Sequence, residues 1–195
     1  MSKKKGVSKK EQFSQPQKSK IPLIVGILAV ILAAGFVFVQ FGGAEKSDQA
    51  YFGEPVVAPR SYVGEFISMT AVEPVVEEGK IKIPLSQVDE NNIVFFELEN
   101  NEGTVVPLMA YITPSGRLFA GSSMCEPCRG RTFSLAGDTL VCDVCRTTYT
   151  IEDHQFISGA VACGSYPPTN MYPVVEDGMI LIEESEVLNW RIRAL

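Results

Sequence analysis

The sequence contains only one histidine, His154, among its 195 residues, and this scarcity excludes several kinds of redox centre. A Rieske cluster takes two histidine ligands, so a single chain cannot complete that set. Covalent haem attachment needs a histidine directly after a Cys-x-x-Cys motif, and here Arg129 and Arg146 occupy that place. The sequence also has no His-Glu-x-x-His motif and no nucleophile elbow, the usual signs of metal-dependent and serine hydrolases. A redox carrier or a binding protein is therefore favoured over an enzyme.

Positive charge is scarce beyond residue 20. Residues 1–20 hold seven lysines and one acidic residue, Glu11. The whole chain has 17 basic and 23 acidic residues. Ten basic and 22 acidic residues therefore lie beyond residue 20, and this part of the chain has a net charge of −12. So acidic a segment repels phosphate backbones, which excludes nucleic acid as a partner. Cationic proteins or metal ions are better candidates, and an acidic surface also serves solubility.

One apolar run, Ile21–Val39, has no charged or hydrogen-bonding side chain. At about 1.5 Å per residue its length is close to the ~30 Å hydrocarbon core of a bilayer, so residues 21–41 are predicted to be a transmembrane anchor. Because lysines lie only on its N-terminal side, we expect residues 1–20 to be a cytoplasmic basic tail and the C-terminal domain to lie outside the cytoplasm. A cleaved secretory signal is the alternative, since small residues follow at Gly42–Ala44, but the run exceeds the usual signal core.

Beyond a linker at residues 42–55, residues 56–195 have the size of one domain with its own core. Frequent glycine and proline, with many β-branched and aromatic residues, favour a mostly β fold. Lys80–Ile83 alternates polar and apolar side chains, as a half-buried strand does, and Glu184–Arg193 is the best candidate for a short helix. Four turn signals separate β-prone runs: Asn100–Gly103, Pro114–Gly116, Ala136–Thr139 and Glu176–Gly178.

The chemistry is concentrated in two Cys-x-x-Cys motifs, the first knuckle (Cys125–Cys128) and the second knuckle (Cys142–Cys145), which thirteen residues separate. A Gly-Asp turn inside this spacer lets one strand run out and the next return, which brings both knuckles to the same end of a hairpin. Four thiolates then converge on one point, as in zinc and iron sites. The sequence therefore predicts a metal centre with the ligands Cys125, Cys128, Cys142 and Cys145.

Three centres fit a four-cysteine ligand set: a [2Fe–2S] cluster, a single iron and a structural zinc ion. Disulfides are a further alternative, because thiols outside the cytoplasm are normally oxidised. The functions that follow are a one-electron carrier, a structural zinc-binding module and a thiol–disulfide exchange protein. Two near-identical knuckles and the lack of a βαβ pattern argue against the third.

Cys163 is the fifth cysteine, and all five fall within 39 residues. We expect it to belong to the cofactor site, where it could replace a knuckle ligand; a bond to another chain or simple burial are the alternatives. His154, between Asp153 and Gln155, is expected at the surface, with a role as a ligand or as a hydrogen-bond donor to the site as the alternative.

Charged side chains adjoin both knuckles. Arg129, Arg131 and Arg146 are placed to offset the charge of −2 that four thiolates leave on a divalent ion, although ordinary surface charge explains them equally well. Glu126 and Asp143, inside the knuckles, are expected to be solvated. If they pointed inward, their negative charge would lower a reduction potential.

At these residues the sequence resembles the FtrD-like family of membrane iron–sulfur-containing proteins, over roughly residues 56–195. The resemblance rests on both knuckles, on the glycine-flanked Cys163 with prolines after it, and on the approach segment EEGKIKIPLSQVDENNIVFFELENNEGTVVPLMAYITPSGRLFAG. It departs from the family motif at Gly164, where asparagine is usual. Members are membrane-attached, and some accompany bacterial ferrous-iron uptake systems. The resemblance implies an iron–sulfur or iron centre on the four knuckle cysteines, with the later cysteine of the motif at Cys163.

A more distant similarity links the chain to Rieske domains, which also combine two knuckles, a proline-containing loop and a closing hairpin such as MYPVVEDGMILI. It favours a small Rieske-like or zinc-ribbon-like β domain and leaves the chemistry open. The expected function is that of a membrane-anchored, extracytoplasmic four-cysteine metal protein that carries electrons. Its expected partners are the membrane and membrane iron-transport or redox proteins, and zinc is the alternative metal.

Overall fold

The computed structural model describes residues 52–193. The predicted tail and anchor and residues 42–51 of the predicted linker lie outside these described residues. Within residues 52–193 no helix has the length and apolar character needed to cross a bilayer. Phe52 is buried, and its ring packs against Phe119 with centroids 5.1 Å apart. The folded domain therefore includes the end of the segment predicted as linker.

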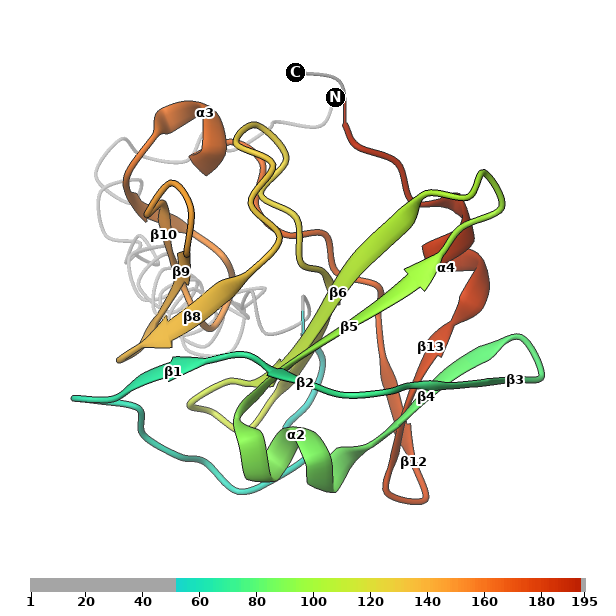
Figure 1. The fold of residues 1–195 in the computed structure, drawn as a ribbon. Helices are drawn as coiled ribbons and strands as arrows, with labels where there is room; N and C mark the ends of the chain where they lie inside the picture. Colours follow the sequence, from blue (N-terminus) through green and yellow to red (C-terminus); the bar gives the residue numbers. More distant parts are fainter. Residues whose placement is uncertain (1–51, 194–195) are drawn as a thin grey trace, which may run out of the picture. The chain divides into compact units, whose positions relative to one another are not determined.

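The described domain is mostly β, as the sequence predicts, and Figure 1 shows its strands with the short helices α2, α3 and α4 between them. Its central sheet has the order β2-β5-β6-β7, with β2 parallel to β5 and the other neighbours antiparallel. The bounds of these strands are Thr70–Ala71 (β2), Ile93–Glu99 (β5), Val105–Ile112 (β6) and Leu118–Ser122 (β7).

Two further sheets flank the central one. The first has the order β12-β13-β4-β3, from Val174–Glu176 (β12), Met179–Glu183 (β13), Lys80–Pro84 (β4) and Val75–Glu77 (β3). The second has the order β1-β8-β9-β10-β11, from Phe66–Ser68 (β1), Phe133–Ala136 (β8), Thr139–Cys142 (β9), Thr148–Thr150 (β10) and Phe156–Ser158 (β11).

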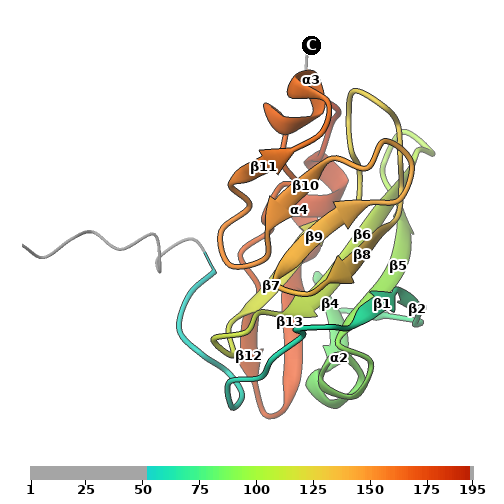
Figure 2. The same cartoon turned by 90° about the vertical axis from the view of Figure 1, so that its left-hand side faces the viewer.

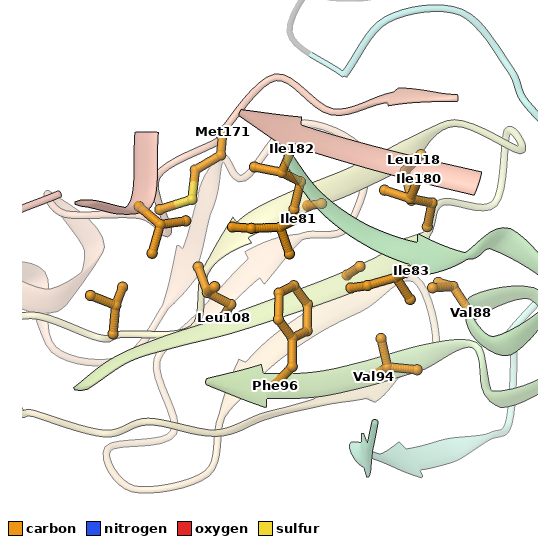
Figure 3. Packing of buried hydrophobic residues seen from close by; sticks show 14 of the residues in the cluster. Ile81, Ile83, Val88, Val94, Phe96, Leu108, Leu118, Met171, Ile180 and Ile182 are labelled. Atoms are coloured by element: carbon orange, nitrogen blue, oxygen red, sulfur yellow. The ribbon is translucent and has the colours of Figure 1, made fainter. Parts of the chain in front are cut away.

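Strand β6 is almost wholly buried because it serves a core on each of its faces. Side chains alternate across a strand, so Leu108 and Ala110 enter one apolar cluster while Met109 and Tyr111 enter the other. The first cluster joins the central sheet to the sheet of β4 and β13. Figure 3 shows it, with Phe96, Leu108, Ile81, Ile83, Ile180 and Ile182 facing one another.

The second cluster joins the central sheet to the five-stranded sheet and carries the knuckle sulfurs. It includes Tyr111 and Phe119 from the central sheet, Phe133 and Tyr149 from the other, and the cysteines Cys125, Cys142 and Cys163. The metal ligands predicted from the sequence therefore lie at the border of an aromatic core, not on a detached loop.

The predicted turns connect the strands that they were expected to connect. The spacer between the knuckles forms the β8–β9 hairpin, with Gly137 at φ 57° in its turn and Phe133 paired with Cys142. The C-terminal helix is α4, Glu184–Asn189, shorter than predicted. The helices α2 (Leu85–Asn91) and α3 (Val161–Gly164) were not expected, because each is too short to show a helical apolar period and buries a single side chain.

Candidate metal centre

Two connections on the five-stranded sheet carry the knuckles. The first knuckle lies between β7 and β8, and the second lies between β9 and β10. Because β8 and β9 pair antiparallel, the start of one strand meets the end of the other, and the two knuckles face each other. Figures 1 and 2 both show these connections at the same end of the domain as α3.

The two knuckles fold into the same turn. The N–H of Arg129 donates to the carbonyl of Cys125 at 2.8 Å, and the N–H of Arg146 donates to that of Cys142 at 3.0 Å. Both arginines have a positive φ, 63° and 61°, a region that L-residues other than glycine seldom occupy. The sequence repeat is therefore also a structural repeat, down to an unusual backbone angle.

The four knuckle sulfurs converge. Cys125 Sγ lies 3.7 Å from Cys145 Sγ, and Cys128 Sγ lies 3.8 Å from Cys142 Sγ. All four sulfurs lie within 4.8 Å of one another, and all five cysteines of the chain are free thiols. The structure therefore brings together the four residues that the sequence analysis selected as metal ligands.

The spacing of the sulfurs fits a single metal ion. A tetrahedral ion with metal–sulfur bonds of about 2.3 Å holds its sulfur ligands about 3.8 Å apart, close to the Cys125–Cys145 and Cys128–Cys142 distances here. A [2Fe–2S] cluster divides its thiolates between two iron atoms, so the two pairs must lie further apart than ligands of one ion. In this conformation the donor set suits one iron or one zinc ion, and a bridged cluster would require the knuckles to separate.

The cage has a buried side and an open side. Cys125 and Cys142 are fully buried against the second apolar cluster, whereas Cys128 and Cys145 are half-buried. The open sulfurs have polar neighbours: the N–H of Gly130 donates to Cys128 Sγ at 3.4 Å, and Thr147 Oγ1 lies 3.2 Å from Cys145 Sγ. A hydrogen bond donated to a thiolate stabilises its charge, so the Gly130 N–H supports negative charge on Cys128 Sγ.

In the absence of metal the structure favours thiolates in the second knuckle. The hydrogen bond with Cys125 lowers the pKa of Cys142 to about 5, against the effect of burial. Burial opposes ionisation of Cys145, but hydrogen bonds from Thr147 lower its pKa. The hydrogen bond to Cys142, followed by burial, raises the pKa of Cys125, and burial raises that of Cys128 to about 12.

Cys163 adjoins the cage without joining the four-sulfur set. It is buried in α3, and its thiol is hydrogen-bonded to Cys125, a contact that helps to raise the pKa of Cys125. Tyr149 Oη donates to the carbonyl of Cys163 at 2.6 Å and holds α3 against the sheet. The expectation that Cys163 replaces a knuckle ligand stays a prediction.

His154 is not at the surface, and that prediction was wrong. Only 4% of the residue is exposed, and Nε2 lies 2.7 Å from Tyr111 Oη among the rings of Phe52, Phe119 and Tyr149. The residue sits in a turn with φ 58°, which directs the ring inward while its polar neighbours stay outside. Burial lowers the pKa of His154 to about 3, although the Pro168 carbonyl opposes the shift.

Glu126 is not solvated, which corrects a second expectation. Its side chain is fully buried and accepts hydrogen bonds from the Arg193 N–H at 2.6 Å and from Arg193 Nε at 2.7 Å. Arg193 also donates to the carbonyl of Pro167 and lies over the ring of Tyr166. The C-terminal segment thus closes over the first knuckle. No local signal in the sequence pairs residues 67 positions apart.

The other charged residues of the knuckles divide into two groups. Asp143 accepts a hydrogen bond from Ser134 Oγ at 2.7 Å and is half-buried. Arg131 forms an ion pair with Glu97 at 2.5 Å, away from the sulfurs. Arg129 and Arg146, by contrast, are exposed, and no ion pair within residues 52–193 includes them.

Comparison with known proteins gives one match. A family model described as "Membrane iron-sulfur containing protein FtrD-like" matches residues 88–193, more than half of the chain and all five of its cysteines. No curated protein and no solved structure matches the chain. The match agrees with the resemblance seen in the sequence, while the Rieske-like or zinc-ribbon-like architecture stays a prediction.

Proposed function

The chain belongs to the FtrD-like family of membrane iron–sulfur-containing proteins, and on that basis we propose that its domain is a one-electron carrier built on a four-cysteine iron centre. The convergence of all four knuckle sulfurs within 4.8 Å is the observation that carries this proposal. Bound there, iron would supply a couple that exchanges one electron. The spacing of the sulfurs favours one iron over a bridged cluster.

The protein's own residues provide what such a carrier needs. Cys125 and Cys142, with the aromatic cluster behind them, exclude water from one side of the centre. Cys128 and Cys145 bring the other side to the surface, where a partner can approach. Because the two knuckles are fixed by the β8–β9 hairpin, their sulfurs need little rearrangement when the charge of the centre changes.

We also propose that the centre lies outside the cytoplasm. The family is described as a membrane family, and the apolar run Ile21–Val39, with lysines only on its N-terminal side, supports an anchor with a cytoplasmic tail. The natural partners of an electron carrier in this position are membrane iron-transport or redox proteins. An accessory role in iron uptake follows as part of the proposal.

The test is elemental and spectroscopic. The full chain is purified in a mild detergent without exposure to air, and iron, zinc and acid-labile sulfide are measured together with visible absorption and EPR. We expect one iron per chain, no labile sulfide and a high-spin ferric EPR signal after oxidation. Two irons with two sulfides would retain the electron carrier and replace the single ion with a cluster. Stoichiometric zinc in a colourless protein would exclude an electron carrier.

A matched pair of variants assigns the ligands. Cys128→Ser removes one open ligand, so bound iron should fall by more than about tenfold, the order of effect that even outer contacts of a metal site reach. Cys163→Ser removes the neighbouring thiol and should leave the iron content unchanged. Equal metal loss in the two variants would make Cys163 a ligand, as the sequence analysis allows.

Structural zinc is the second candidate, because the sulfur spacing suits zinc as well as iron. A structural zinc site contributes directly to the free energy of folding. In that case a chelator should unfold the five-stranded sheet, and the protein should show no redox signal with or without metal. Reversible oxidation of the metal-loaded protein would exclude this candidate.

A further inference from the structure

Charge is distributed unevenly around the open side of the cage. Residues 52–193 contain 9 basic and 20 acidic side chains, a net charge of −11. Seven of the nine cations form ion pairs within these residues. The two that do not are Arg129 and Arg146, and each directly follows a half-buried ligand, Cys128 or Cys145. The unpaired positive charge of the described domain is thus concentrated where the sulfurs reach the surface.

The two arginines also share a backbone conformation. Both have φ values near +60°, where glycine is unstrained and a β-carbon is not. Glycine would satisfy the turn at lower conformational cost, yet the chain carries arginine at both equivalent positions. Strained residues of this kind cluster at binding and active sites. The knuckle carboxylates, in turn, are already bonded, Glu126 to Arg193 and Asp143 to Ser134.

Exposed apolar side chains lie on the second knuckle and on the elements that follow it, β11 and α3. Val144, at the tip of the second knuckle, is 64% exposed, and Val161 on α3 is 74% exposed. Phe156 and Ile157 are exposed on β11, which is the edge strand of the five-stranded sheet. Gly159, between β11 and α3, packs directly on the backbone of Thr147 beside the second knuckle. An exposed apolar edge beside a functional site is typical of a protein–protein interface.

We propose that this surface, the cage face (Arg129, Arg146, Val144, Phe156 and Val161), docks an acidic, apolar-centred face of a redox protein and that electrons cross it through Cys128 and Cys145. The inference rests on the proposed function, because it supplies the path for the electron. The arginines complement carboxylates on the rim of the partner, and the apolar residues bury its centre.

An anionic membrane surface would also attract arginines and apolar side chains, but two observations favour a protein. The described domain as a whole has a net charge of −11 and would be repelled by anionic headgroups. Docking on lipid would also cover the half-buried sulfurs with hydrocarbon and close the route for electrons.

The test uses two outer-sphere oxidants of opposite charge, hexacyanoferrate(III) and tris(phenanthroline)cobalt(III). Each takes one electron from the reduced protein and becomes the iron(II) or cobalt(II) complex. The full chain is reduced in a neutral detergent, and the second-order rate constant with each oxidant is measured by stopped flow. We infer that the anionic probe docks at the arginines in spite of the net negative charge. The ratio of the two rate constants cancels any change in reduction potential that affects both reactions.

The decisive variants are Arg129→Gly with Arg146→Gly, which remove both charges and relieve the strained backbone, so that folding is not at risk. The anion-to-cation ratio should fall by at least about tenfold, the order expected from two unit charges near a trivalent probe. Arg129→Lys with Arg146→Lys should restore the ratio. Arg131→Gln, which loses a cation already paired with Glu97, should leave it unchanged.

The other outcomes distinguish a failure of the proposed function from a failure of the docking surface. A wild-type protein that reacts with neither oxidant would contradict the proposed function and with it the docking surface. Reaction with both, at a ratio that the glycine variants do not change, would overturn the docking surface alone. A third measurement uses the protein reconstituted in vesicles with and without anionic lipid. If anionic lipid slows the reaction with both probes, and the glycine variants remove this effect, the surface faces lipid. That result would overturn the protein partner.

Discussion

At the scale of single residues, buried charge controls the first knuckle. Glu126 is fully buried in the first knuckle, between Cys125 and Cys128, whereas the side chain of its partner Arg193 is 40% exposed. A buried carboxylate is tolerated only when it is paired, so Arg193 keeps a negative charge next to the sulfurs from destabilising the knuckle.

We expect Arg193→Ala to destabilise the domain, because Glu126 would stay buried without its charged partner. The free energy of unfolding should fall by about 1–3 kcal/mol, measured by urea denaturation of the metal-loaded protein. Arg191→Ala is the matched control: its ion pair with Glu102 is exposed, and its loss should change stability by less than about 1 kcal/mol. An equal loss of stability in the two variants would mean that the buried Glu126–Arg193 pair contributes no more than an exposed ion pair.

His154 should give the domain a specific pH dependence. Its pKa is about 3 in the folded protein and about 6.5 in an unfolded chain. Between these values the unfolded state binds the extra proton, so stability is full above pH 6.5 and falls by up to about 1.4 kcal/mol per pH unit below it.

His154→Gln, which keeps a hydrogen-bonding group near Tyr111, should remove this slope. The measurement is the free energy of unfolding from pH 7 to pH 5 for both proteins at constant metal. If the free energy of unfolding depended on pH in the same way in the wild type and the variant, the pKa of His154 would not be lowered in the folded protein.

At the scale of elements, the close contact between the β11–α3 connection and the second knuckle holds the open side of the cage in place. Gly159 has φ 110°, and a β-carbon there would lie 2.6 Å from Thr147 Cα. Thr147 in turn contacts Cys145 Sγ. The packing of a connection outside the knuckles therefore sets the position of a ligand.

Gly159→Ala should therefore lower both the melting temperature and the retention of metal. Gly178→Ala is the control: Gly178 also has a positive φ, 74°, but no atom lies near a β-carbon there. The control should show only backbone strain, of order 1 kcal/mol, and unchanged metal retention in a competition assay with a chelator. Similar metal loss in both variants would rule out the contact with Thr147 as the cause.

At the scale of the whole domain, two apolar clusters share one central sheet, and only one of them contains the cysteines. Metal binding should therefore stabilise the two halves unequally. The cluster between the central sheet and β4–β13 is complete without any sulfur ligand, whereas the five-stranded sheet depends on the knuckles at one end.

Removal of the metal should raise amide hydrogen exchange in β8, β9 and β10 by more than about tenfold, while β4 and β13 keep their protection. Hydrogen exchange with mass spectrometry on the loaded and chelated protein measures both regions at once. Uniform loss of protection would instead mean that the domain unfolds as one cooperative unit and that the metal contributes to global stability.

The sequence was enough to predict the convergence of the four knuckle cysteines, the hairpin between the knuckles and the turns between the strands. These features depend on contacts between near neighbours: a Gly-Asp turn reverses the chain, and strand pairing then brings Cys128 and Cys142 together. Spacing along the chain is enough to predict them. The resemblance to the FtrD-like family rests on the same local motifs and is confirmed by the family match.

Which polar side chains are buried depends on the tertiary packing. His154 is turned inward by a left-handed residue angle, and Glu126 is buried by an arginine 67 positions away; the sequence analysis expected both at the surface. Arg129 and Arg146 have no ion pair within the described domain, whereas its seven other cations each have one. Burial and ion pairing depend on the packing of distant segments, and a local pattern carries no record of that packing.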